Sequence, residues 1–203
     1  MANPIGAIEA FKDAFTPHSG PVLCVVLVGR KLGAAAESCR AAAEGRADVV
    51  VIETDDCAMA DAASVTADCL VSLHRASSFG ADLARAVLVG CPVVATGYGG
   101  PMDFLTDEYA ELVPYTLSAS KGRAFPFPAG TEWAEPDIEA AAAALRFVHD
   151  DLSGARRKAW LGRSAVIRRC GPKSASRALR RRLGESPFSP PQSADCHRLG
   201  AAR

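Results

Sequence analysis

The sequence predicts an α/β fold in which a parallel β-sheet carries helices on both faces. Apolar residues (AVILMFWYC) make up 49% of its 203 residues, so the chain can bury a sizeable core. Short apolar runs rich in β-branched residues alternate with Ala-rich stretches of helical spacing. The apolar runs lack polar alternation, which is typical of parallel strands buried on both faces.

Local signals place each element in order. The first helix begins at Pro4 behind the capping residue Asn3, and its apolar residues recur at helical spacing. Gly45 and Gly90 are placed to end two later helices, and Asp137 to begin another. We expect strands at 21–29, 47–53, 69–73, 92–96 and 111–115. We expect helices at 33–44, 57–66, 79–89, 101–105, 137–150, 152–170 and 173–183.

Domain organisation follows from where this periodicity stops. Residues 118–136 are rich in Gly, Pro and Phe, and we expect them to be irregular. The alternation of strands and helices indicates one domain over residues 1–183. Residues 184–203 are rich in Pro and Ser and have no periodicity, so the sequence predicts a disordered tail.

Charge is unevenly distributed, although the formal net charge is zero. Residues 1–150 carry 10 Lys/Arg and 20 Asp/Glu, whereas residues 151–203 carry 13 and 3. The basic run 177–183 has no interleaved aromatic residues, so the sequence favours a solvated helical face over a nucleic-acid contact.

The cysteines and histidines indicate a reducing, cytoplasmic compartment without a metal site. The chain has seven cysteines, an odd number, and no C-x-x-C pair, so we expect no disulfide framework. Cys24, Cys69 and Cys91 lie in apolar runs, where a free cysteine behaves as a small hydrophobe. The histidines are scattered, with none at metal-ligand spacing. No apolar run approaches the ~18 residues of a transmembrane helix, so we expect no membrane span.

Several motifs stand in order along the chain. Residues 72–105 contain SLHR, FG, LA, PVVATG, GYGG and DF, and residues 133–137 read WAEPD. In this combination the sequence resembles the donor-binding half of family 4 glycosyltransferases, which have the GT-B fold. The resemblance runs from residue 3 to residue 183. It implies a Rossmann-like parallel sheet flanked by helices, one half of a GT-B architecture, in which the strand before the first helix is missing.

By this resemblance the chain transfers a sugar from a nucleotide-sugar donor to an acceptor hydroxyl with retention of configuration. The nucleotide-sugar is a substrate, and neither a cofactor nor a metal is implied. A separate chain would then supply the N-terminal acceptor domain. Ser77 and Arg85 stand where the family has glutamates, and Arg can donate to ribose hydroxyls but cannot accept from them. Two alternatives therefore stay open: an inactive module that binds a nucleotide or polyanion, and a truncated relic of a glycosyltransferase.

Candidate binding residues come from the carboxyl ends of the expected strands, where parallel sheets bind ligands. Arg30 and Lys31 follow the first strand, where the family places a basic residue near the diphosphate. The turn 97–100 opens a short helix whose backbone N–H groups can meet an anion. The sequence identifies no catalytic residue. The donor-binding candidates are Arg30, Lys31, His74, Arg75, Ser77, Phe79, Gly80, Arg85, Gly97, Gly99 and Gly100.

Overall fold

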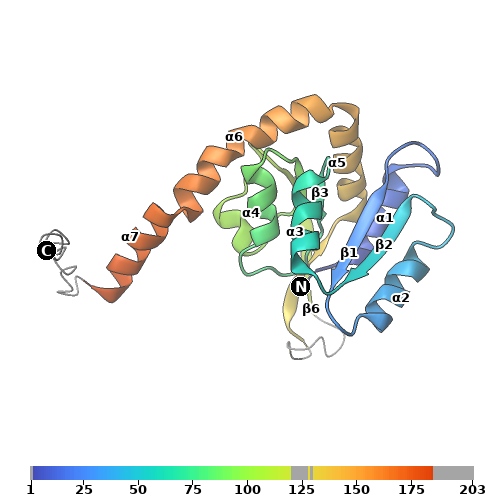
Figure 1. Ribbon diagram of the computed structural model, residues 1–203, viewed down its shortest axis with the longest axis horizontal. Coiled ribbons are helices and arrows are strands. Elements are labelled where there is room, and N and C mark those ends of the chain that lie inside the picture. Colours follow the sequence, from blue (N-terminus) through green and yellow to red (C-terminus); the bar gives the residue numbers. More distant parts are fainter. Residues whose placement is uncertain (1, 120–127, 129, 185–203) are drawn as a thin grey trace, which may run out of the picture.

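The computed structural model describes residues 2–119, 128 and 130–184, and it has the expected α/β architecture (Figure 1). Parallel strands are flanked by helices, which confirms the predicted fold class. The strands are β1 (Leu23–Val28), β2 (Val49–Thr54), β3 (Leu70–Ser72), β4 (Val93–Thr96), β5 (Glu111–Val113), β6 (Tyr115–Ala119) and β7 (Glu132–Pro136). The helices are α1 (Pro4–Ala14), α2 (Gly33–Ala42), α3 (Cys57–Thr66), α4 (Ala81–Leu88), the 3-10 helix η1 (Gly100–Asp103), α5 (Ile138–Asp150), α6 (Leu152–Cys170) and α7 (Pro172–Leu183).

The parallel strands form two ladders rather than one continuous sheet. Strand β1 pairs with β2 along its whole length, and β4 pairs with both β3 and β5. All four residues of β4 are buried, as expected of a strand between two others. Within the described residues no ladder joins β1 to β3.

The contacts of helix α1 with both ladders show how the ladders are oriented relative to each other. Arg75 follows β3 and donates from Nη1 to Oδ1 of Asn3, the N-cap of α1 (3.1 Å). Arg46 precedes β2 and donates from Nη1 to the carbonyl oxygen of Lys12, near the end of α1 (3.4 Å). The start of α1 thus lies at the carboxyl end of β3, and its end lies at the amino end of β2. Both ladders therefore run in the same direction.

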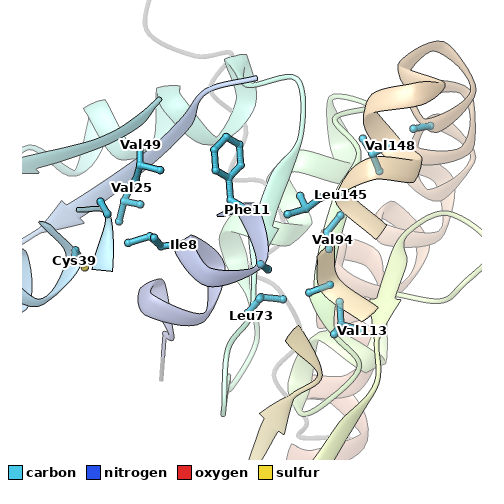
Figure 2. Packing of buried hydrophobic residues seen from close by; sticks show 14 residues of the cluster. Ile8, Phe11, Val25, Cys39, Val49, Leu73, Val94, Val113, Leu145 and Val148 are labelled. Carbon is cyan, nitrogen blue, oxygen red and sulfur yellow. The ribbon is translucent and has the colours of Figure 1, made fainter. Parts of the chain in front are cut away.

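The main core joins the two ladders through side chains. Ile8 and Phe11 of α1 lie between the side chains of β1 and β2 and those of the second ladder (Figure 2). Helix α5 packs against α1 and closes this core. A second buried cluster lies between α4 and α6, where Gly162 lies so close to Tyr109 and Val87 that a Cβ atom would overlap both.

A strand pair corrects the expectation for residues 118–136. Instead of being irregular throughout, this part of the chain supplies β7, which pairs antiparallel with β6. The expected strand 111–115 was also wrong as one element, because it divides at Pro114 into β5 and β6. Pro114 has no N–H for a ladder, and its carbonyl oxygen accepts from the Asp137 N–H (2.9 Å). Residues 120–127 and 129 lie outside the described residues.

Helix α6 runs across the body of the molecule beside α4, and α7 extends outward from it (Figure 1). Helix α7 contributes no buried residue. None of the helices in the described part of the chain is both long and apolar enough to cross a membrane. Apart from Gly184, the tail expected to be disordered lies outside the described residues.

The expectation that the strand at 21–29 is buried on both faces was wrong, because the side chain of Cys24 is exposed on β1. Side chains alternate along a strand, so Cys24 points away from the face on which its neighbour Val25 enters the core. Cys91 is buried as expected, and Cys69 is half-buried.

Alkylation should separate the cysteines into two classes. Burial raises the pKa of the Cys69 thiol to about 12 and also raises the pKa of the Cys39 and Cys91 thiols. Thiolates are the reactive form, so these three should resist alkylation at pH ~8, while the exposed Cys24 and Cys57 react. Peptide mapping by mass spectrometry before and after denaturation measures this. Equal labelling of Cys24 and Cys91 in the native protein would contradict it.

Candidate functional site

Two turns meet at the carboxyl end of the β3–β4 pair. Residues 73–80 connect β3 to α4, and residues 97–100 connect β4 to η1. The Gly100 N–H donates to the carbonyl oxygen of Ser77 across this contact (3.0 Å). The structure therefore brings most of the predicted site residues together at the edge where parallel sheets bind ligands.

The glycines allow these two turns to touch. At Gly99 the φ angle is +80°, and a Cβ atom would lie 2.8 Å from the Ser77 carbonyl oxygen. A Cβ atom on Gly100 would overlap the carbonyl oxygen of Ser78. Gly80 has a φ angle of +78° and caps the start of α4. Backbone proximity thus accounts for Gly99 and Gly100, and the positive φ angle accounts for Gly80.

The buried side chain of His74 also links the two turns. Its side chain is 3% exposed, and its Nε2 lies 2.9 Å from the carbonyl oxygen of Tyr98. Nδ1 lies 3.1 Å from Oγ of Ser72 and 3.2 Å from the carbonyl oxygen of Ser72. His74 therefore ties the end of β3 to the glycine turn rather than facing a ligand.

Arg75 is held by three protein partners. Its Nε and Nη2 donate to the two carboxylate oxygens of Glu135 on β7 (2.6 Å each), and Nη1 donates to Asn3. The guanidinium lies over the Trp133 ring, 5.4 Å from its centroid. The backbone N–H of Ala134 also donates to the Arg75 carbonyl oxygen (3.0 Å). This paired arginine anchors β7 and α1 beside β3.

A double-mutant cycle should detect this anchor. We expect Arg75→Gln and Glu135→Gln each to cost about 1–2 kcal/mol, less than a buried pair because both side chains are partly exposed. The second substitution should cost little once the first is present, because the pair acts as a unit. Denaturant unfolding of the single and double variants measures the coupling. Strictly additive losses would show that the two side chains act independently.

Phe79 and Arg85 lie toward α4. The Phe79 ring is 43% exposed and packs at a tilt on Phe104, with 5.4 Å between the centroids. Arg85 forms an ion pair with Asp61 of α3. Sequence reasoning missed Asp61 and Glu135 as partners of the two arginines. They lie 24 and 60 residues away along the chain, and no local signal connects them.

The N–H groups of the glycine turn are largely used within the protein. The Gly97 N–H donates to the Val113 carbonyl oxygen (3.0 Å) and the Tyr98 N–H to that of Thr96 (2.8 Å). With Gly100 bound to Ser77, three of the four turn residues donate to the protein itself. The turn therefore shapes the edge, and anion binding needs other donors.

Two cationic side chains that could donate to an anion lie just after the end of β1. Arg30 and Lys31 are both exposed there. Because the two ladders run in the same direction, these cations lie at the same edge as the turns 73–80 and 97–100. Two buried polar atoms at this edge, Asn3 Nδ2 and Thr96 Oγ1, have no hydrogen-bond partner within the described residues. Among these residues no three His, Cys, Asp or Glu side chains are grouped to hold a metal ion.

Comparisons with known proteins bear on the fold. No protein-family model matches this sequence, and a search of curated proteins gave no significant match. Among solved structures the chain is similar to sucrose-phosphate synthase from Thermosynechococcus elongatus, with a TM-score of 0.62 and 18% sequence identity. The match covers 91% of this chain and 44% of that one, so the chain spans less than half of its neighbour. The chain thus has parallel strands flanked by helices in an arrangement similar to a GT-B glycosyltransferase domain.

Proposed function

We propose that this chain binds a nucleotide-sugar at the carboxyl edge of its parallel strands, as the donor-binding half of a retaining glycosyltransferase. The observation that carries the proposal is the pair of exposed cations, Arg30 and Lys31, at the same edge as the two glycine-shaped turns. The likeness of the fold to a glycosyltransferase domain supports the same assignment. Another chain would supply the acceptor domain.

The proposed chemistry explains why cations belong at this edge. In glycosyl transfer the bond between the anomeric carbon and a diphosphate oxygen breaks, and the acceptor oxygen forms the new bond. Negative charge develops on the departing nucleoside diphosphate, and fixed cations stabilise that charge. Arg30 and Lys31 would take this role. The unpartnered Asn3 Nδ2 and Thr96 Oγ1 support a polar ligand at the same edge, because buried polar atoms are normally hydrogen-bonded.

Thermal unfolding with UDP, GDP, ADP and their sugar conjugates tests the proposal. A ligand at 100 times its Kd stabilises the native state by about 2.7 kcal/mol. At about 2–4 °C per kcal/mol, one nucleotide series should raise the midpoint by about 5–11 °C. The double variant Arg30→Ala/Lys31→Ala should lose this shift, while the control Lys173→Ala on exposed α7 should keep it. A cooperative transition that no nucleotide shifts would contradict donor binding.

The two residues at the family's glutamate positions favour a second function, an inactive module that binds a nucleotide or another polyanion. Ser77 has no carboxylate, and the Arg85 guanidinium suits phosphate better than ribose hydroxyls. A bound phosphate would share this guanidinium with Asp61, its ion-pair partner in the structure. The module should prefer a nucleotide that carries an extra ribose phosphate, and Arg85→Glu should weaken that preference at least tenfold. Release of free nucleoside diphosphate from a bound nucleotide-sugar would favour the enzyme instead.

A further inference from the structure

Helix α7 carries an apolar stripe that no described part of the chain covers. Four apolar residues recur along it at intervals of three and four, which places them on one side of the helix. They are Pro172, Ala175, Leu179 and Leu183, and all four are exposed. The two leucines are 58% and 68% exposed. Because α7 extends outward from the body of the molecule, this apolar side is open to solvent (Figure 1).

The rest of the α7 surface is cationic. Lys173, Arg177 and Arg181 recur at intervals of four and form the side opposite the stripe. Arg180 and Arg182 border the stripe on its two flanks. Within the described residues none of these five side chains forms an ion pair. Their charge is therefore available to an anionic partner.

Helix α6 is also basic, but its cations are used within the protein. Arg156 pairs with Asp68 (2.5 Å), and Lys158 pairs with Glu111 (2.6 Å). The Arg163 guanidinium lies over the ring of a neighbouring tryptophan, 5.1 Å from its centroid. The unpaired positive charge of these two helices is thus concentrated on α7.

Charge and apolar surface together indicate the kind of partner. Helices α6 and α7 carry six and five Lys or Arg residues and no Asp or Glu. Two copies of the chain that met through α7 would bring like charges together. Nucleic acid offers negative phosphates but no apolar layer for the leucines. An anionic lipid bilayer offers both, because its charged headgroups lie directly above acyl chains.

We propose that α7 binds the surface of an anionic lipid bilayer, with Leu179 and Leu183 entering the boundary between headgroups and acyl chains. Arg180 and Arg182 would reach the lipid phosphates from the flanks, because a long side chain can keep its charged end in the headgroup layer. Twelve residues are too few to cross a bilayer, so the helix would lie in the plane of the interface. The proposal does not depend on nucleotide-sugar binding.

Vesicle binding by the full chain tests the proposal. In co-sedimentation the chain should bind vesicles of phosphatidylcholine mixed with phosphatidylglycerol, but not vesicles of phosphatidylcholine alone. Each cation near an anionic surface strengthens binding about fivefold, so Arg177→Gln/Arg180→Gln/Arg181→Gln should weaken it about 100-fold. The same three arginines changed to lysine should preserve binding, because the charge is kept. Equal binding to both kinds of vesicle, or to neither, would overturn the proposal.

The apolar contact has its own test. Leu179→Ala/Leu183→Ala should weaken binding to the anionic vesicles at least about tenfold, because it removes the inserted side chains. Phe147→Ala on α5 removes an equally exposed apolar side chain (58%) and should leave vesicle binding unchanged. Since these positions are exposed, the variants should keep the unfolding midpoint of the unaltered chain. Undiminished binding by the leucine variant would show adsorption by charge alone and refute the insertion.

Two further measurements distinguish other occupants of the same face. The chain should elute as a monomer in size-exclusion chromatography, and a dimer that the α7 variants dissociate would assign the face to a second copy. A DNA duplex that binds with a lower Kd than the anionic vesicles at the same salt concentration would assign it to nucleic acid. Either result would refute the lipid assignment. Nucleotide titration of the leucine variant tests the nucleotide-sugar proposal separately.

Discussion

Gly100→Ala should destabilise the protein by about 3 kcal/mol or more, which corresponds to a midpoint lower by about 6–12 °C. A Cβ atom at this position would overlap the carbonyl oxygen of Ser78, and both sides of the contact are backbone. No side-chain rotation can relieve such an overlap, so one of the two turns must move. Because both turns form the proposed binding edge, the variant should also lose any nucleotide-dependent stabilisation. Thermal unfolding with and without nucleotide measures both effects.

Gly33→Ala is the matched control for this substitution. Gly33 begins α2, and a Cβ atom there would meet nothing within 4 Å. Because alanine restricts the unfolded chain more than glycine does, we expect a change between zero and a gain of about 1 kcal/mol. If Gly33→Ala and Gly100→Ala lowered the free energy of unfolding equally, the close contact between Gly100 and Ser78 would not be the cause of the Gly100→Ala effect.

Phe104→Ala should cost about 3–5 kcal/mol, the range for a large buried aromatic side chain. Phe104 is fully buried at the end of η1, where it packs in the cluster between α4 and α6. Its ring also supports the exposed Phe79 ring beside α4. The substitution should therefore leave a cavity and loosen the turn 73–80. Denaturant unfolding should give a lower midpoint at an unchanged slope.

Phe147→Ala is the matched control for Phe104→Ala, because it removes an aromatic ring that is not buried. Phe147 lies on α5 and is 58% exposed, so its removal should change stability by no more than about 0.5 kcal/mol. A loss as large as that of Phe104→Ala would mean that the outer face of α5 is covered in solution.

Most of the fold was predictable because its signals are local. The apolar runs at β1, β2 and β4 and the capping residues Asn3 and Asp137 lie at the expected places. Strand pairing across long separations has no such signal. Strand β6 is mostly exposed and joins a partner beyond residues 120–127, so its sequence lacked the apolar run that marked the parallel strands. The division into two ladders likewise depends on which edges meet in space, and element order alone does not determine this.

The edge at which most of the candidate residues gather was predictable from the sequence, but the partners of their side chains were not. The glycines and His74 lie at the expected edge, because strand ends can be read from the sequence. What Arg75 and Arg85 do depends on Glu135 and Asp61, which reach them from β7 and α3. Both arginines, expected to face a donor, are paired within the protein. Arg30 and Lys31 stay exposed because they lie at the end of β1, outside the contact between the two turns.

The packing of α1 against α5 has a consequence during protein synthesis. Arg146 donates to the Asp13 carbonyl oxygen (3.0 Å) across 133 residues of sequence, and Leu145 lies in the same core cluster as Phe11. A nascent chain leaving the ribosome presents the apolar face of α1 long before α5 exists to cover it. Fragments that contain α1 but not α5 are thus exposed to aggregation, and this core is complete only once α5 has been made.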